Sequence, residues 1–247
     1  MKLQDIFTQL TCGEFSQISI GGLQPGIIDE GNYKHLVAFI NLGLTKLYQR
    51  FALKEGRITL ELKPSLATYA LRSQFGVASR RSREPVRYIL DMDDPFQDDI
   101  HKIERILTMD KKEMPLNDRD NEYSCFTPSM NTLIVPQSIL APTTDTPEWL
   151  VTPTIDVYYR ANHPIITIPI GPFDPNRIDI ELPYSHLEAL LYFVAARAHN
   201  PVGMTNEFHT GNTYAAKFEG ICAELERNNI RIDQGAQVNR LRQKGFV

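Results

Sequence analysis

Apolar residues recur at helical spacing near the N-terminal end of the sequence. The stretch "LQDIFTQL" places four of them on one face of a short helix: Leu3, Ile6, Phe7 and Leu10. A longer stretch follows between Asp29 and Gly56, with apolar residues every three or four positions: Tyr33, Leu36, Val37, Ile40, Leu44, Leu47, Tyr48 and Phe51. We predict one long helix of about 24 residues here, with Asp29 as its N-cap and Gly56 as its stop.

The spacing changes from helical to alternating after Gly56. "RITLEL", "TIDVYYR" and "RIDIEL" alternate apolar and polar residues as strands do, and "NTLIVP" and "PIITIPI" are short apolar runs bounded by proline. Between Pro64 and Pro183 lie 14 of the 16 prolines, which interrupt helices and the interior of sheet ladders. We therefore predict strands and loops for this region.

One run in this region fits two structures. In "DDIHKIERIL", the spacing of Ile100, Ile103, Ile106 and Leu107 suits a short helix and a strand equally well. Periodicity alone does not choose between them.

Helical spacing returns toward the C-terminal end. "SHLEALLYFVAARAHN" begins with a capping-box pattern at Ser185 and Glu188, and a final helix is predicted from about Asn206 to Asn229. The two helices are expected to form a hairpin that buries Leu190, Val194, Phe218 and Ile221. Small residues allow helices to approach closely, so the candidate packing positions also include small side chains: Leu190, Val194, Ala195, Ala216, Phe218, Gly220 and Ile221.

Together these elements predict an α+β fold. Residues 1–56 and 183–230 are expected to form a discontinuous helical bundle, from the N-terminal long helix and the C-terminal helical hairpin, around a central β-rich insertion at 57–182. Residues 231–247 follow as a C-terminal arm with too few apolar residues to bury a core face of their own.

Charge and cysteine content exclude several classes of protein. The 26 Lys and Arg residues nearly balance 30 Asp and Glu, so no overall field draws the chain to nucleic acid or to an anionic membrane. Cys12, Cys125 and Cys222 are odd in number and far apart, unlike a disulfide framework or a Cys-x-x-Cys zinc site. The apolar runs are shorter than the ~20 residues of a membrane helix, so a soluble protein of a reducing cytoplasm, without membrane contact, is expected.

Catalytic and metal-binding signatures are missing from the sequence. It contains no P-loop, GxGxxG, GxSxG, HExxH or paired Cys-x-x-Cys motif, so neither an enzyme nor a cofactor is expected. The acidic run Asp91–Asp99 fails as an EF-hand loop because Phe96 stands where that loop needs glycine, and a solvated loop is favoured. His199 and His209 lie near each other without a third ligand, so no metal is assigned.

The run "ASRRSREPVR" concentrates four arginines, Arg80, Arg81, Arg83 and Arg87. A solvated loop is the simpler interpretation, because most charge runs face water. Guanidinium groups also bind phosphates and carboxylates in a bidentate manner. The four residues are therefore candidate contacts to DNA or to an acidic partner surface.

Three stretches resemble the head-to-tail adaptor proteins of tailed bacteriophages, also called neck or head completion proteins. They are "LQDIFTQL", "INLGLTKLYQRFAL" and "LPYSHLEALLYFVAARAHNPVGMTNEFHTGNTYAAKFEGICAELERNNI", which together cover roughly the first fifty and last seventy residues. Such adaptors similarly follow a last β-segment with an "LP…LLYFVAARAH" type of helix, a short break and a second helix with an acidic end. The region from Arg57 to Leu182 matches no pattern of that family.

The resemblance implies a structural virion protein that forms a homo-oligomeric ring of about twelve copies in the neck, after assembly in the cytoplasm of the host bacterium. Its implied partners are the portal protein, the tail tube or tail nozzle protein, and genomic DNA in transient passage through the ring. The C-terminal arm would dock into the portal through basic and apolar residues: Arg240, Leu241, Arg242, Phe246 and Val247.

Two alternatives remain at this point. The chain could be another structural or receptor-contacting phage protein, whose β-rich module binds a partner. Less favoured is an enzyme with an unrecognised carbohydrate or nucleotide site formed by Asp91–Asp99.

Overall fold

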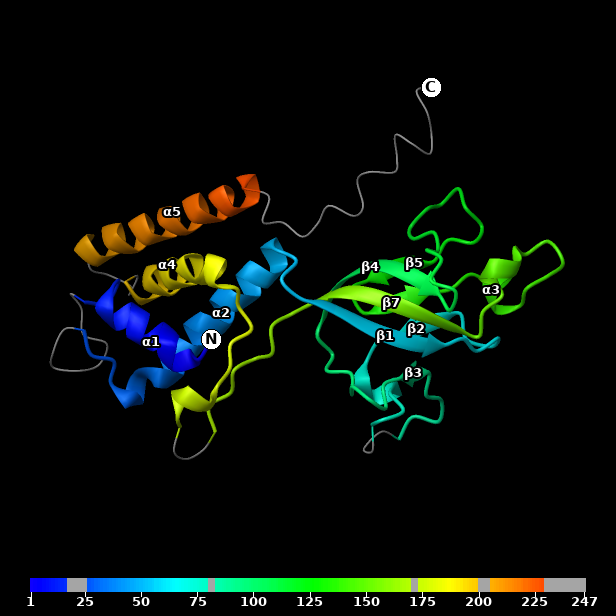
Figure 1. Ribbon diagram of the computed structural model, residues 1–247, viewed down its shortest axis with the longest axis horizontal. Coiled ribbons are helices and arrows are strands. Elements are labelled where there is room, and N and C mark those ends of the chain that lie inside the picture. The colour runs from blue at the N-terminus through cyan, green and yellow to red at the C-terminus, as the bar shows by residue number, and fades with distance from the viewer. Residues whose placement is uncertain (17–25, 80–82, 170–172, 200–204, 229–247) are drawn as a thin grey trace, which may run out of the picture. The chain divides into compact units, whose positions relative to one another are not determined.

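The computed structural model describes residues 1–16, 26–79, 83–169, 173–199 and 205–228, with only the backbone at 205–209 (Figure 1). The chain forms two compact units. A helical unit consists of Met1–Leu53 and His163–Val247, and a β-rich unit consists of Lys54–Asn162. The α+β class, the long N-terminal helix, the C-terminal helix pair and the central antiparallel sheets are confirmed.

The second boundary between the units lies about twenty residues before the predicted one, because residues 163–182 belong to the helical unit. Ile166, Ile180 and Leu182 are buried in the helical core. The strand predicted for "RIDIEL" is wrong, since this segment forms only an isolated antiparallel bridge between Lys2 and Asp179. Alternating apolar residues here serve to cover helices rather than to build a sheet.

The helical unit contains four α-helices and three short 3-10 helices within the described residues. They are α1 (Leu3–Cys12), η1 (Glu30–Asn32), α2 (Tyr33–Arg50), η4 (Pro175–Arg177), η5 (Tyr184–His186), α4 (Leu187–Ala198) and α5 (Thr205–Arg227). The apolar faces predicted for the first two helices are confirmed, because Leu3, Ile6 and Leu10 of α1 and most of the predicted positions of α2 are buried.

The long helix is shorter than predicted. α2 has 18 residues and ends at Arg50, where Phe51 takes an extended conformation, and Asp29 precedes the 3-10 turn η1 without capping α2. Gly56 lies in a strand, where a Cβ would come within 2.3 Å of the Tyr159 ring. Glycine is therefore needed at this position for the close approach of an aromatic ring, and it is not a helix stop.

The helix α4 lies between two other helices. Ala189, Leu190, Val194 and Ala195 are fully buried, because α4 packs on α2 and on α5. Its start differs from the prediction, since the Ser185 hydroxyl lies 3.0 Å from Nδ1 of His186 and no side chain caps the helix. A helix buried on nearly all sides needs apolar residues on every face, which explains its mixture of large and small apolar side chains.

The β-rich unit contains two antiparallel sheets that share one core. The strands are β1 (Glu55–Glu61), β2 (Thr68–Ala70), β3 (Ile89–Leu90), β4 (Ile100–Thr108), β5 (Phe126–Ser129), β6 (Thr132–Ile134) and β7 (Thr154–Ala161), with the short helices η2 (Ser73–Phe75), α3 (Gln137–Leu140) and η3 (Glu148–Leu150). The strand orders are β3-β1-β7-β4 and β2-β6-β5. Leu60 and Val157 from the first sheet join Tyr69 and Leu133 from the second in this core.

The ambiguous run "DDIHKIERIL" forms the edge strand β4. Its register against β7 shifts twice, between Ile100 and Lys102 and between Ile103 and Arg105. Each shift adds one residue to β4, so isoleucines three residues apart still pair with alternate residues of β7 and face the core. The bulges explain why the apolar spacing resembled that of a helix.

Truncation of Phe218 tests the packing of α5 on α4. The Phe218 ring is 7% exposed and meets the Phe193 ring edge to face, with centroids 5.3 Å apart. We expect Phe218→Ala to lower the free energy of unfolding by about 3–5 kcal/mol, as measured by chemical denaturation. The exposed neighbour Ala216→Ser is the matched control, and a loss below about 1 kcal/mol for Phe218→Ala would contradict the burial.

Candidate functional site

The predicted packing residues of the helix pair divide into two groups. Leu190, Val194, Ala195 and Phe218 are buried in the helical core. Ile221, also predicted to be buried, is half-buried and packs against the same core.

Ala216 and Gly220 are exposed, and a Cβ built on Gly220 meets nothing within 4 Å. These two residues do not pack on another helix within the described residues, and their part in helix packing between subunits stays a prediction. The face of α5 that carries them is small-sided and open to a second molecule.

The arginine-rich loop is only partly described. Arg80 and Arg81 lie outside the described residues. Arg83 is exposed, while Arg87 is half-buried and donates from Nη1 to the Val77 carbonyl oxygen at 3.3 Å. One of the four arginines is therefore engaged within the β-rich unit.

The arm residues predicted to dock into the portal all lie outside the described residues. They are Arg240, Leu241, Arg242, Phe246 and Val247.

The acidic run Asp91–Asp99 holds loops together. Asp91 is 6% exposed and accepts hydrogen bonds from the backbone N–H groups of Ala78, at 2.9 Å, and Phe96, at 3.1 Å. Asp98 binds Ser73, and Asp99 accepts a hydrogen bond from the Tyr159 hydroxyl at 2.9 Å. The carboxylates point to different partners, and no group of three potential metal ligands occurs among the described residues.

Of the histidine pair, only His199 has a described side chain, and it is engaged within the helical unit. His199 is 8% exposed, stacks on Tyr214 and has Nε2 3.3 Å from the Glu14 carbonyl oxygen. The side chain of His209 lies outside the described residues. His199 therefore helps to join α4, α5 and the end of α1.

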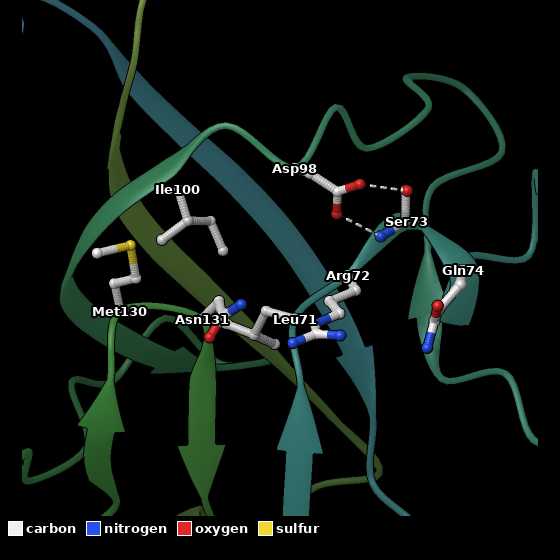
Figure 2. Close-up of a pocket in the computed structure, with 8 residues that line it drawn as sticks. All are labelled: Leu71, Arg72, Ser73, Gln74, Asp98, Ile100, Met130 and Asn131. Carbon is white, nitrogen blue, oxygen red and sulfur yellow. Dashed lines mark hydrogen bonds between the residues drawn. The ribbon is translucent and has the colours of Figure 1, made fainter. Parts of the chain in front are cut away.

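A pocket of about 330 Å³ lies in the β-rich unit, and the sequence analysis did not identify it. Its walls come from three separate parts of the chain, as Figure 2 shows: Leu71, Arg72, Ser73, Gln74, Asp98, Ile100, Met130 and Asn131. No local motif marks it, because the residues near 72 and 131 meet through the pairing of β2 with β6, and Asp98 joins them through hydrogen bonds to Ser73. At this volume the pocket is at the lower limit for a small-molecule site.

One wall of the pocket is fixed by an aspartate in a left-handed conformation. Asp98 has φ of 58° and accepts two hydrogen bonds from Ser73, at 2.6 Å from the backbone nitrogen and 2.5 Å from the hydroxyl (Figure 2). These bonds satisfy the carboxylate. The Ser73 hydroxyl is thereby held by a carboxylate, with no histidine in the described lining to act as a general base.

The positive charge of the pocket comes from Arg72. Its side chain is exposed and makes no hydrogen bond or ion pair within the described structure, and Figure 2 shows the guanidinium beside Leu71 and Asn131. Met130 is 60% exposed and Ile100 is buried, so an apolar wall adjoins the charge. A guanidinium next to an apolar wall suits a carboxylate on a short aliphatic stem, such as an acidic side chain of a partner.

A buried histidine is the least expected polar group of the helical unit. His186 is 1% exposed, its ring meets Phe51 edge to face at 4.7 Å, and its Nε2 has no hydrogen-bond partner among the described residues. Burial lowers the pKa of His186.

No protein-family model matches the chain, and no curated protein matches it. Among the helices that the structure describes, none is long and apolar enough to cross a membrane. Two surfaces of the described residues are candidates for recognition of a partner: the exposed face of α5, and the pocket with Arg72.

Substitution of Asp91 distinguishes loop closure from metal binding. A Cβ at Gly76 would lie 2.4 Å from Oδ2 of Asp91, so the carboxylate fits closely against the Gly76 backbone. We expect Asp91→Asn to lower the free energy of unfolding by about 1–3 kcal/mol, because an amide replaces an acceptor of two backbone N–H groups. Melting temperatures should not respond to Ca²⁺ or Mg²⁺, and a metal-dependent rise that is absent in the variant would reject this interpretation.

Stability should fall in acid because of His186. Its folded pKa is lowered, so below the unfolded value of about 6.5 the unfolded chain takes up a proton that the folded chain does not. Stability is therefore retained above that pH and lost as pH falls toward the folded pKa. Thermal unfolding at about pH 7.5 and pH 5 should show a smaller acid-induced loss for His186→Gln than for the wild type, and equal losses would contradict the prediction.

Proposed function

We propose that the protein is a structural head-to-tail connector of a tailed bacteriophage. The observation that carries the proposal is the composition of the helical unit. The third stretch that resembles adaptor proteins lies more than a hundred residues after the first two, yet all three belong to one unit, with α1, α2 and α5 packed against α4. Most of the segment without resemblance, up to Asn162, forms the separate β-rich unit, and residues 163–182 join the helical unit.

The surface of the helical unit supports an assembly role. α5 packs on α4 with one face and leaves Ala216, Gly220 and Ala223 exposed on another. Subunits of a ring need one surface that meets a different surface of the next copy. Nearly balanced charge over the chain also fits a passage that does not hold DNA tightly.

The proposed partners follow from this role. About twelve copies would form the ring in the virion neck, between the portal protein and the tail tube or tail nozzle protein. The arm from Arg231 to Val247, with its basic and apolar residues, would bind the portal.

A second candidate function is that of a phage protein whose β-rich unit contacts a receptor or another virion protein. The pocket favours it, because the Arg72 side chain makes no hydrogen bond or ion pair within the described residues and the pocket suits an acidic side chain. Localisation distinguishes the two functions, since a connector lies in the neck and a receptor-contacting protein lies at the distal tail.

Assembly with portal rings tests the connector function. We expect the purified chain, mixed with portal rings, to give a complex that contains about twelve copies of the 28.2 kDa chain, as measured by native mass spectrometry. A chain that lacks Asn239–Val247 should keep its melting temperature and lose portal binding. Failure of the full-length chain to bind portal rings, or normal binding by the truncated chain, would count against the connector or its arm, respectively.

A further inference from the structure

Two segments of the helical unit border a groove of about 240 Å³. Its lining consists of His163, Pro164, Ile165, Ile166, Thr167, Ile178, Asp179 and Glu181, and we name it the strand groove. Ile165 is 78% exposed, Ile166 is 8% exposed and Thr167 is exposed again. Burial thus alternates as it does in a strand, although no strand pairs with this segment in the described structure.

The backbone of the first segment has one satisfied side and one open side. Ile166 donates its N–H to Oδ1 of Asn41 at 3.0 Å and accepts from Nδ2 of Asn41 at 2.9 Å. Backbone groups of neighbouring residues in an extended chain point to opposite sides. Those of Ile165 and Thr167 therefore point away from Asn41, and within the described structure they make no hydrogen bond.

The second segment is open in the same manner. Ile178 and Ile180 bond with the backbone of Leu3 and Met1, so the backbone groups of Asp179 between them point away from the N-terminal residues. The groove is thus bordered on both sides by main-chain groups that can pair with an added strand.

The next residues after α5 have the sequence of a strand. They lie outside the described residues and read Asn229-Ile230-Arg231-Ile232-Asp233, with two β-branched isoleucines that alternate with polar residues. Arg231 would also meet acidic side chains at the groove, since Asp179 and Glu181 are exposed.

The groove and α5 lie on different sides of the helical unit. Near the end of α2, Arg50 binds Glu219 and Glu226 of α5. Tyr48, two positions earlier in α2, donates its hydroxyl hydrogen to the Glu181 carbonyl at the groove. Side chains two positions apart differ in direction by about 200° around a helix, so these two contacts lie on different sides of α2. Figure 1 shows α5 and the yellow-green segment with η4 on opposite sides, with α4 and α1 between them. The described end of α5 and the groove thus lie on different sides of the unit, as a head-to-tail contact between copies requires.

We propose that Asn229–Asp233 of one copy binds the strand groove of the next copy as an added β-strand that pairs with Ile165 and Thr167. This inference deepens the proposed ring, on which it rests. It names a head-to-tail contact in which each copy gives a segment on one side and receives one on the other, as a closed ring requires. The residues after Asp233 remain available for the portal.

A mixed disulfide experiment tests the contact between copies. Chains with Thr167→Cys and chains with Ile232→Cys, each also carrying Cys12→Ser, are combined and oxidised in the presence of portal rings. We expect a covalent pair of the two chains on a non-reducing gel. Lys46→Cys replaces Thr167→Cys as the control, because Lys46 is exposed and lies two positions from Tyr48, on another side of α2.

A backbone substitution tests the strand pairing itself. Thr167→Pro removes the free N–H group and Thr167→Ala keeps it, and both should retain the wild-type melting temperature because Thr167 is exposed. We expect the proline variant to assemble about tenfold less well and the alanine variant to assemble normally.

The outcomes separate this inference from the connector function. If rings form without the covalent pair, or form equally well from the Thr167→Pro variant, the proposed binding of Asn229–Asp233 to the strand groove is rejected, and the connector function is not affected. A covalent pair without ring formation rejects the connector ring and supports the groove. A chain that carries both Thr167→Cys and Ile232→Cys tests pairing within one copy. A disulfide that forms within this chain, but never between chains with one of the two substitutions, also overturns the proposal.

Discussion

The contact between α2 and α4 at Gly43 determines how the helical unit is built. A Cβ at this position would lie 2.6 Å from Cδ1 of Leu190 and 3.0 Å from the Phe193 ring, so only glycine lets the two helices come this close. α4 then carries α5 on its other side, through Phe193 and Phe218. α1 also packs on α4, so α4 is the helix that contacts each of the other described α-helices of the unit.

The helices were predictable where burial is one-sided. The apolar faces of α1 and α2 follow from sequence, because Leu3, Ile6 and Leu44 occupy positions that a regular helix brings together. The end of α2 was not predictable, because glycine commonly ends helices, whereas Gly56 lies in a strand and leaves space for the Tyr159 ring. In β4, two bulges change a period of two into a period of three, and a bulge depends on its partner strand rather than on local residue preference.

The candidate surfaces were less predictable than the fold. Arginine density drew attention to the loop from Arg80 to Arg87, yet Arg87 binds a carbonyl of its own unit. The isolated Arg72 instead lines a pocket, and its side chain makes no hydrogen bond or ion pair within the described residues. The acidic run likewise marked a concentration of charge, but Asp91 and Asp98 close loops. Local composition shows where charges occur along a chain, whereas pairing across the fold decides which of them remain free for a partner.

The β-rich unit begins and ends at neighbouring positions. The Ala161 N–H donates to the Lys54 carbonyl at 2.9 Å, and β1 and β7 pair along their whole length. A module whose two ends meet can be gained, lost or exchanged as a single piece, because the host chain needs only a short connection to close the gap. Exchange of this module as one piece would change the surface that the β-rich unit presents while the core of the helical unit stays the same.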